Sequence, residues 1–368
     1  MSPAKSRVVI IGGSFAGLVA ASRLSCDHDV TVVDGRADFE WTPNIHEVLS
    51  GVKNRDGVVL SRDECVSRYG HSFVNDVVTH IDRDSNTVST EGGLELAYDA
   101  CLIAAGSRRT MCGVEGADKH AVGFRFVDDA IDIKSRLDRL AARQRRASVV
   151  IVGGGVSGIE VLGEILRRRA QGDAFNIHVV ELEERILSQQ PQGLVDDAEQ
   201  RLAPHSIKLH TDAAVKQVSA RSVTLESGEK LTADLCIWSA GMNLPDFLRD
   251  AGLNADDDEW LPVDDTLRSL YADNIFVAGD CASLPVPVRK QAYYAMDMGE
   301  VAGDNINRLL GDRRLRRFRP APMPMLISLG DITTWLVAGE SVVASPILAA
   351  AKEAVYQATM ARLESPRE

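Results

Sequence analysis

Two glycine-rich stretches, VVIIGGSFAG at 8–17 and VVIVGGGVSG at 149–158, have residue types and a spacing suited to binding phosphate groups. The first glycine of each, Gly12 or Gly153, permits a tight turn, and the last, Gly17 or Gly158, lets a helix pack closely on the preceding strand. The free amides and positive dipole end of that helix attract a pyrophosphate. We therefore predict two dinucleotide sites.

An acidic residue follows each turn, at the end of the next strand. It is Asp34 in HDVTVVD and Glu181 in NIHVVE, where a carboxylate accepts hydrogen bonds from ribose hydroxyls. Ser14 takes the middle position of the first turn, and its hydroxyl can donate to phosphate. Because Glu181 would repel a 2′-phosphate, we predict NADH rather than NADPH. Arg185 lies close enough in sequence to soften that preference.

The elements that must position these residues are strand–helix–strand units. Residues 7–11 and 148–152 are apolar runs, as expected of strands buried on both faces. Helices follow at about 15–25 and at 156–170. The expected fold class is α/β, with two Rossmann-like dinucleotide-binding domains and a small C-terminal α+β segment.

Composition limits the function classes. The 368 residues suffice for two domains, and 45% hydrophobic with 26% charged residues is typical of globular proteins. A formal charge of −12 argues against a general nucleic-acid binder. No apolar run is long enough to cross a bilayer, and a strand is expected soon after the N-terminus. We expect a cytoplasmic location and leave open a peripheral position on the inner face of the membrane.

Three further stretches carry a resemblance to a known family. They are YDACLIAAGSRR at 98–109, LTADLCIWSAGMN at 231–243 and NIFVAGDCA at 274–282. Together with the two turns, they resemble the two-dinucleotide-domain flavoproteins of the pyridine nucleotide-disulfide reductase superfamily. Type II NADH dehydrogenases and apoptosis-inducing-factor-like quinone reductases are the members most similar. The resemblance implies tightly bound FAD in the first unit and NADH as cosubstrate in the second.

The same resemblance implies a discontinuous FAD domain. Its two parts are expected at 1–112 and 266–320, with the NAD(H) domain at 113–265 between them. Residues 321–368 form the C-terminal segment. MPMLISL and TTWLVAG are expected to be strands, followed by a helix over 345–363 that Ser345 caps.

The resemblance also implies a set of cofactor contacts. Asp280 would bind the ribityl hydroxyls, the Val78 backbone the adenine, and DFEWTPNIHEVLSG at 38–51 would pass beside the flavin ring. The residues expected at FAD are Gly12, Gly13, Ser14, Phe15, Ala16, Gly17, Asp34, Gly35, Arg36, Pro43, Asn44, Val78, Ala105, Gly106, Gly279, Asp280, Lys290, Gln291 and Ala292. Those expected at NADH are Gly153, Gly155, Val156, Ser157, Gly158, Glu181, Ala240 and Gly241. No metal site is expected.

Three residues are candidates for catalysis. Glu160 and Glu164 lie four apart and share a helix face. The resemblance implies that they lie at the flavin–nicotinamide junction, where a carboxylate orients the nicotinamide amide or relays protons. Lys290 is expected near the flavin C2 carbonyl, where it would stabilise negative charge on the reduced ring. We expect His46 to be solvated or to face a helix rather than to react.

The electron acceptor is the open question. The six cysteines are scattered and none forms C-x-x-C, which argues against a redox-active disulfide, and Cys112 with Cys281 is the only conceivable pair. A quinone acceptor is favoured, although AYYAMDMG at 292–299 carries Tyr293 and Asp297 where type II NADH dehydrogenases have glutamines. The alternatives are a reductase of a small redox protein such as ferredoxin or rubredoxin, and an NADH-sensing flavoprotein.

The C-terminal segment bears on membrane contact and on homodimers. An apolar helix stripe is expected at Ile347, Leu348, Ala351, Val355 and Leu363, facing a membrane, a second copy or the chain itself. The basic run RRLRRFR at 313–319 is expected to be a solvated connecting turn, with contact to anionic lipid as the alternative.

Overall fold

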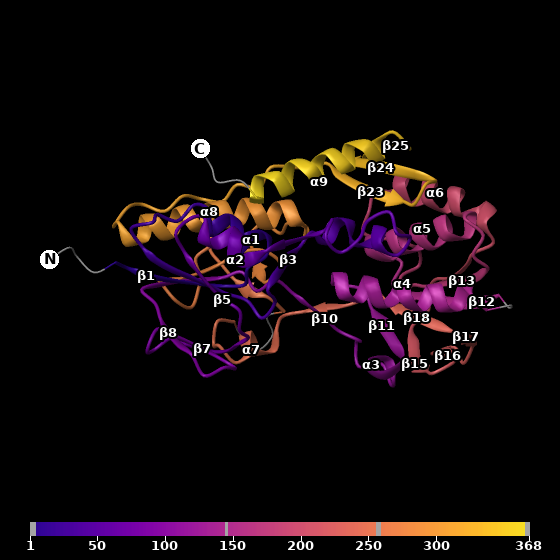
Figure 1. The fold of residues 1–368 in the computed structure, drawn as a ribbon, viewed down its shortest axis with the longest axis horizontal. Helices are drawn as coiled ribbons and strands as arrows, with labels where there is room; N and C mark the ends of the chain where they lie inside the picture. Colours follow the sequence, from indigo (N-terminus) through magenta and orange to yellow (C-terminus); the bar gives the residue numbers. More distant parts are fainter. Residues whose placement is uncertain (1–4, 144–145, 255–258, 365–368) are drawn as a thin grey trace.

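A computed structural model describes residues 5–143, 146–254 and 259–364 (Figure 1). Its centre is a pair of five-stranded parallel sheets, each the core of one unit. The first unit contains, in sheet order, β21 (Ile275–Val277), β9 (Ala100–Ile103), β1 (Arg7–Ile11), β2 (Asp29–Val33) and β5 (Ser72–Val74). The second contains β11 (Ala121–Gly123), β18 (Leu235–Trp238), β12 (Ala147–Val152), β13 (Phe175–Val180) and β14 (Lys208–His210).

The two units repeat one arrangement. In each, the central strand runs into a helix, α1 (Phe15–Ala21) or α5 (Val156–Ala170), and the chain returns as the neighbouring strand. A three-stranded antiparallel sheet then precedes the strand on the other side of the centre. These sheets are β6 (Val78–Asp82), β7 (Thr87–Thr90) and β8 (Glu95–Ala97) in the first unit, and β15 (Val215–Ser219), β16 (Ser222–Leu225) and β17 (Lys230–Thr232) in the second. The predicted α/β fold class is thus confirmed.

Short elements connect the units and cover their sheets. The two linkers between the units pair as β10 (Arg108–Arg109) and β19 (Met242–Asn243), at the waist of the molecule in Figure 1. The other short strands pair as β3 (Asp38–Glu40) with β4 (Val59–Ser61) and β20 (Leu261–Pro262) with β22 (Ala282–Ser283). The remaining short helices are η1 (Thr42–Val48), α2 (Arg62–Ser67), α3 (Ala117–His120), α4 (Val127–Ala141), α6 (Gln192–Leu202), η2 (Ala203–His205) and α7 (Asp246–Arg249).

The long helix α8 (Ala292–Leu310) lies against α1, and glycines allow the close approach. A Cβ at Gly299 would overlap the Ala16 carbonyl oxygen. The basic run after α8 is a loop in which the arginines are exposed and Phe318 is buried. Arg316 and Arg317 form ion pairs with Asp304 and Asp265, as expected of a connecting turn.

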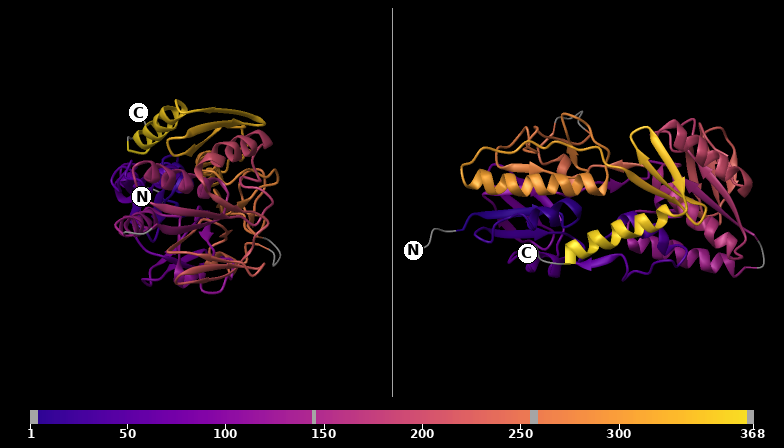
Figure 2. Two further views of the ribbon diagram at one scale, coloured as in Figure 1. Left: turned by 90° about the vertical axis from the view of Figure 1, so that its right-hand side faces the viewer. Right: turned by 90° about the horizontal axis from the view of Figure 1, so that it is seen from above.

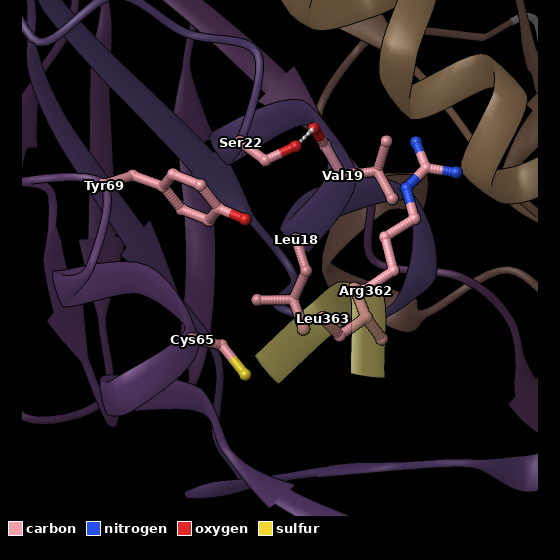
Figure 3. A pocket seen from close by; sticks show the side chains of 7 residues that line it. All are labelled: Leu18, Val19, Ser22, Cys65, Tyr69, Arg362 and Leu363. Carbon is pink, nitrogen blue, oxygen red and sulfur yellow. Dashed lines mark hydrogen bonds between the residues drawn. The ribbon is translucent and has the colours of Figure 1, made fainter. Parts of the chain in front are cut away.

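The C-terminal segment spans both units (Figure 2). It contains β23 (Met325–Leu329), β24 (Thr333–Ala338), β25 (Ser341–Ser345) and α9 (Leu348–Glu364). The first two strands were predicted, whereas β25 was not. Tyr356 of α9 donates to the Gly57 carbonyl of the first unit, and the helix end packs on α1 and α2 around a pocket of about 10 Å³ (Figure 3). That volume holds no more than a water molecule.

The expected apolar stripe of α9 is not the face that packs on the rest of the chain, except at Leu363. The buried side chains of the helix are those of Lys352, Tyr356, Met360 and Leu363. Val355 is 54% exposed, and Ile347 precedes the helix and is 81% exposed. Ser345 is the last residue of β25, so it does not cap the helix, which starts at Leu348 and not at 345. Lys352 faces inward because its ammonium group pairs with a carboxylate of α5. The buried face of the helix therefore includes a charged residue, which the apolar pattern placed in solvent.

Within the described ranges, no helix combines the length and the apolarity that crossing a bilayer requires.

Candidate functional site

The two glycine-rich turns have the same backbone geometry. Gly12 and Gly153 adopt φ of +101° and +103°, a region that side chains other than glycine rarely enter. A Cβ at Gly17 or Gly158 would overlap the carbonyl oxygen of that first glycine. Each turn therefore needs glycine at both ends, and each brings a helix N-terminus against the end of its central strand.

The two acids are held in matching ways. Asp34 accepts hydrogen bonds from the amides of Gly13 at 2.8 Å and Arg36 at 2.9 Å. Glu181 accepts from the corresponding amides, those of Gly154 at 2.6 Å and Glu183 at 3.0 Å. Since a carboxylate has about four acceptor sites, each acid retains capacity for ribose hydroxyls.

The structure brings the other predicted FAD residues to the same edge of the first sheet. Ala105 and Gly106 follow β9, Gly279 and Asp280 follow β21, and these strands are neighbours. Ser107 donates to Asp280 Oδ2 at 3.2 Å. Ala240 and Gly241 occupy the equivalent place after β18 in the second unit. Val78, at the start of β6, is buried.

The residues present fit a dinucleotide at each turn. No side chain caps the N-terminus of α1 or of α5, so no capping side chain competes with a phosphate for the first amides of these helices. Around Gly155, a Cβ would find no atom within 4 Å, which leaves open space where a phosphate would lie. Val156 and Ser157 begin α5 from this position.

Lys290 lies beside Asp280, at the carboxyl end of the first sheet. Its ammonium donates to the Asp280 carbonyl and lies 3.6 Å from the centre of the Trp260 ring. Burial lowers the pKa of Lys290, and Asp280 partly offsets that effect. Gln291 and Ala292 begin α8 at the same place, and Gln291 Nε2 contacts Met325 Sδ at 2.8 Å.

Pro43 and Asn44 lie in η1, the short helix of the first unit that packs against α4 and α5 of the second. Asn44 is 2% exposed. Its Oδ1 accepts from Trp41 Nε1 at 2.8 Å, and its Nδ2 donates to Glu47 at 2.9 Å. Both amide atoms are engaged by the chain, so this segment is rigidly held.

Glu160 is the centre of a buried polar cluster, which we name the α5 cluster. It comprises Glu160 and Glu164 of α5, His46 of η1, Ser50, Arg167, Ser328 of β23 and Lys352 of α9. Lys352 Nζ lies 2.6 Å from Glu160 Oε1, 3.2 Å from Ser328 Oγ and 3.4 Å from His46 Nε2. These three acceptors match the three protons of an ammonium group.

His46 is 1% exposed and faces the helix α5, one of the two positions expected for it. Burial lowers its pKa well below the usual value, and the Lys352 charge adds to the effect. A neutral ring that accepts at Nε2 carries its proton on Nδ1, which lies 3.7 Å from Glu160 Oε2. The cluster thus holds a neutral imidazole beside the Glu160–Lys352 ion pair, in addition to the ion pair of Glu164 with Arg167.

Glu164 lies one turn further along α5 and is 1% exposed. Its Oε2 accepts from Ser50 Oγ and from Arg167 at 3.0 Å, whereas its buried Oε1 has no hydrogen-bond partner. Burial raises the pKa of Glu164 to about 7, and burial also raises that of Glu160. Glu164 therefore has an environment suited to holding or releasing a proton near neutral pH.

Several predicted features lie apart from this cluster. Tyr293 is half-buried and its ring lies against that of Tyr294, with centroids 4.1 Å apart and the rings tilted by 38°, whereas Asp297 is exposed. Arg185 is paired with Asp196 and Glu199 of α6. All six cysteines are free, and Cys112 is exposed whereas Cys281 is buried.

Two functional candidates were missed by the sequence analysis. Lys352 interrupts an apolar run, and its helical spacing to Tyr356, Met360 and Leu363 was the available signal. Arg125 donates to the Ser107 carbonyl at 2.8 Å and lies 4.0 Å from Asp280. It reaches the first unit from the linker before α4, which no local pattern reveals.

The profile of the pyridine nucleotide-disulphide oxidoreductases matches residues 6–299, most of the chain. The chain belongs to this family. The suspected family resemblance is thereby confirmed.

Relatives within the family carry quinone-reductase names. The demethylphylloquinone reductase NdbB of Synechocystis is 27% identical over 351 residues, covering 90% of this chain and 86% of the relative. The type II NADH:quinone oxidoreductase of Haemophilus influenzae is 25% identical over 382 residues, covering 89% and 85%. The structure of NDH2 from Plasmodium falciparum in complex with NADH aligns with a TM-score of 0.88 at 16% identity, covering 97% of this chain and 95% of that one. That last likeness establishes a shared fold.

Proposed function

We propose that this chain is a FAD-dependent NADH oxidoreductase that passes electrons to a quinone and uses no redox-active disulfide. The observation that carries the proposal is the pair of equivalent nucleotide-binding turns in one chain, each with its acid. The quinone-reductase names of relatives that span nearly the whole chain support the choice of acceptor. When bound, the flavin would accept hydride from NADH and pass electrons on.

The residues of the chain would bind and orient the two cofactors and would transfer protons. We assign FAD to the first unit, with the domain parts 1–112 and 266–320, and NADH to the second, 113–265. Asp34 and Glu181 would hold the riboses and Asp280 the ribityl chain. Arg125, which lies 4.0 Å from Asp280, would add positive charge near the ribityl chain.

Glu164 would relay the proton that quinone reduction requires, and Glu160, ionised in its pair with Lys352, would orient the nicotinamide amide. Both glutamates lie on the face of α5 that meets η1, the segment expected beside the flavin ring. Lys352 keeps Glu160 within a buried ion pair at 2.6 Å. We therefore place proton handling in the α5 cluster rather than at Asp297, which is exposed.

Two finer assignments follow. The Glu181 carboxylate would disfavour the 2′-phosphate of NADPH, so NADH is the expected cosubstrate. The exposed apolar residues around β25 and α9, among them Val343, Ile347 and Val355, support this segment as the surface for peripheral membrane contact or a homodimer. Vesicle flotation and sedimentation of the purified protein separate those two outcomes.

Stopped-flow spectroscopy tests the main proposal. The purified protein is reduced by NADH and then mixed with a soluble quinone, ferredoxin or oxygen, while the flavin absorbance is followed. We expect quinone to reoxidise the protein much faster than oxygen does. Reoxidation by quinone no faster than by oxygen would overturn the acceptor assignment, and a colourless protein that takes up no flavin would overturn the whole proposal.

A further inference from the structure

Arg62 is a buried cation behind the first glycine-rich turn. Arg62 is the first residue of α2 and is 4% exposed. Nε donates to the Gly13 carbonyl at 2.6 Å, and Nη1 donates to the carbonyls of Arg36, at 2.6 Å, and of Asp38. Nη1 also lies 3.5 Å from Asp34 Oδ1. A single guanidinium therefore ties together the turn, the acid and the segment that follows the acid.

The stem of the same side chain constrains the turn sterically. A Cβ at Gly13 would lie 2.8 Å from Arg62 Cδ, closer than real Cβ contacts allow. The packing of Arg62 therefore favours glycine at position 13. The turn and the arginine form one packed unit.

The second unit fixes the equivalent carbonyl differently. The Gly154 oxygen accepts from the backbone amide of Leu187 at 2.9 Å, and Leu187 adopts a φ of +53°. The atom that a Cβ at Gly154 would meet first is Ile186 Cγ2, at 2.9 Å. Both turns thus have the carbonyl of their second residue, Gly13 or Gly154, held in place, but only in the first turn is it held by a charged side chain, which also lies near the ribose acid.

We propose that Arg62 is a positioning residue that keeps the first turn and Asp34 in their nucleotide-binding arrangement, and so sets how tightly this unit retains FAD. The inference rests on the proposed function, which assigns FAD to the first unit. Charge-assisted hydrogen bonds are stronger than neutral ones. A prosthetic group that stays bound needs a turn that is held by the stronger, charge-assisted hydrogen bonds. The turn around Gly154 is held by uncharged groups, which suits a cosubstrate that exchanges on every turnover.

Three variants test this role. Arg62→Met keeps the stem and removes every donor, and Arg62→Lys keeps the charge but cannot reach the carbonyls together. Arg168→Met is the matched control, because Arg168 is also buried and charged but contacts Asp138 of α4, Asp173 and the Leu49 carbonyl after η1, and not the first glycine-rich turn. The readouts are the rate of FAD release from the diluted holoprotein, followed by flavin fluorescence, and NAD⁺ affinity from a fluorescence titration.

We expect Arg62→Met to release FAD at least about tenfold faster than wild type, since one charge-assisted hydrogen bond is worth that much. The rate of FAD release from Arg62→Lys should lie between those of wild type and Arg62→Met. The NAD⁺ affinity of both variants should stay at the wild-type value. Arg168→Met should lower the melting temperature without speeding FAD release. If Arg62→Met yields no folded protein, Arg62→Lys carries the test alone.

Two results would overturn the role. One is FAD release from folded Arg62 variants at the wild-type rate. The other is an equal loss of FAD and NAD⁺ affinity, which would indicate general unfolding. Wild-type protein that holds no FAD would instead overturn the proposed function and, with it, this assignment.

Discussion

Asp34 and Glu181 make the same pair of backbone contacts in the two units. Each carboxylate accepts one amide from its own glycine-rich turn and one from two residues further along the chain. An aspartate and a longer glutamate thus reach one geometry, because both carboxylates are fixed by backbone donors at 2.6 to 3.0 Å. Any difference between the two sites must come from what surrounds these acids.

Replacement of Glu181 tests the choice of cosubstrate. In Glu181→Ala, we expect kcat/KM for NADH to fall about tenfold or more, because hydrogen bonds to an ionised acceptor are lost. The value for NADPH should fall less, since the repulsion of its 2′-phosphate is removed as well. Steady-state rates with both nucleotides measure the ratio. Glu183→Gln, which changes an exposed side chain and leaves the amide, is the control, and a wild-type preference for NADPH would contradict the prediction.

The Glu160–Lys352 pair should behave as a buried ion pair. Lys352→Met leaves the Glu160 charge without its cation, and we expect a loss of about 3–5 kcal/mol in the free energy of unfolding. The double variant Glu160→Gln with Lys352→Met has no buried charge at the pair and should regain much of that loss. Urea unfolding is measured for the wild type, the single variants Glu160→Gln and Lys352→Met, and the double variant. A double variant as unstable as the sum of the single ones would argue against direct coupling.

Glu164 should make stability depend on pH. Its pKa is about 7 in the folded protein, whereas an unfolded glutamate has a pKa of about 4.3. Between these values the folded state binds more protons than the unfolded state, so this contribution weakens the fold as pH rises, by about 3–4 kcal/mol at most. Glu164→Gln removes the titration and should gain stability relative to wild type between about pH 5 and pH 8.

Urea unfolding across that pH range checks the effect of Glu164. Glu183→Gln again provides the control, because it removes a carboxylate from the surface. Parallel pH profiles for the wild type and Glu164→Gln would contradict the assignment.

Lys290 should influence the flavin potential. In Lys290→Met, the positive charge beside Asp280 is lost, and we expect a more negative midpoint potential, because negative charge on the reduced flavin is stabilised less. Spectroscopic redox titration measures the change, and Lys290→Arg should remain near the wild-type value. Lys134→Met, which removes a surface charge paired with Asp138, should have no effect. An unchanged potential in Lys290→Met would place the lysine away from the ring.

The sequence was informative where local geometry decides the structure. The turns at Gly12 and Gly153 were predictable because a tight turn and a close helix require glycine at fixed spacing. The apolar strands β1 and β12 were equally clear. Glu160 and Glu164 were recognisable as one helix face, although nothing local showed that both would be buried.

Long-range polar contacts were beyond prediction. Arg62 reaches Gly13, and Lys352 reaches Glu160, across stretches of chain that carry no periodic signal. The buried face of α9 was unpredictable for the same reason, apart from Leu363, since a buried Lys352 contradicts the rule that charged residues face water. Such contacts depend on which elements the tertiary fold brings together.

The position of β21 has a consequence for biosynthesis. Phe276 pairs with Leu102 of β9, so the first sheet gains its last strand only after the whole second unit has been translated. Every strand of the second sheet lies within one continuous stretch, from Ala121 to Trp238. During synthesis on the ribosome, the second unit is thus complete first. The first unit, whose sequence is split, can then complete its folding beside it.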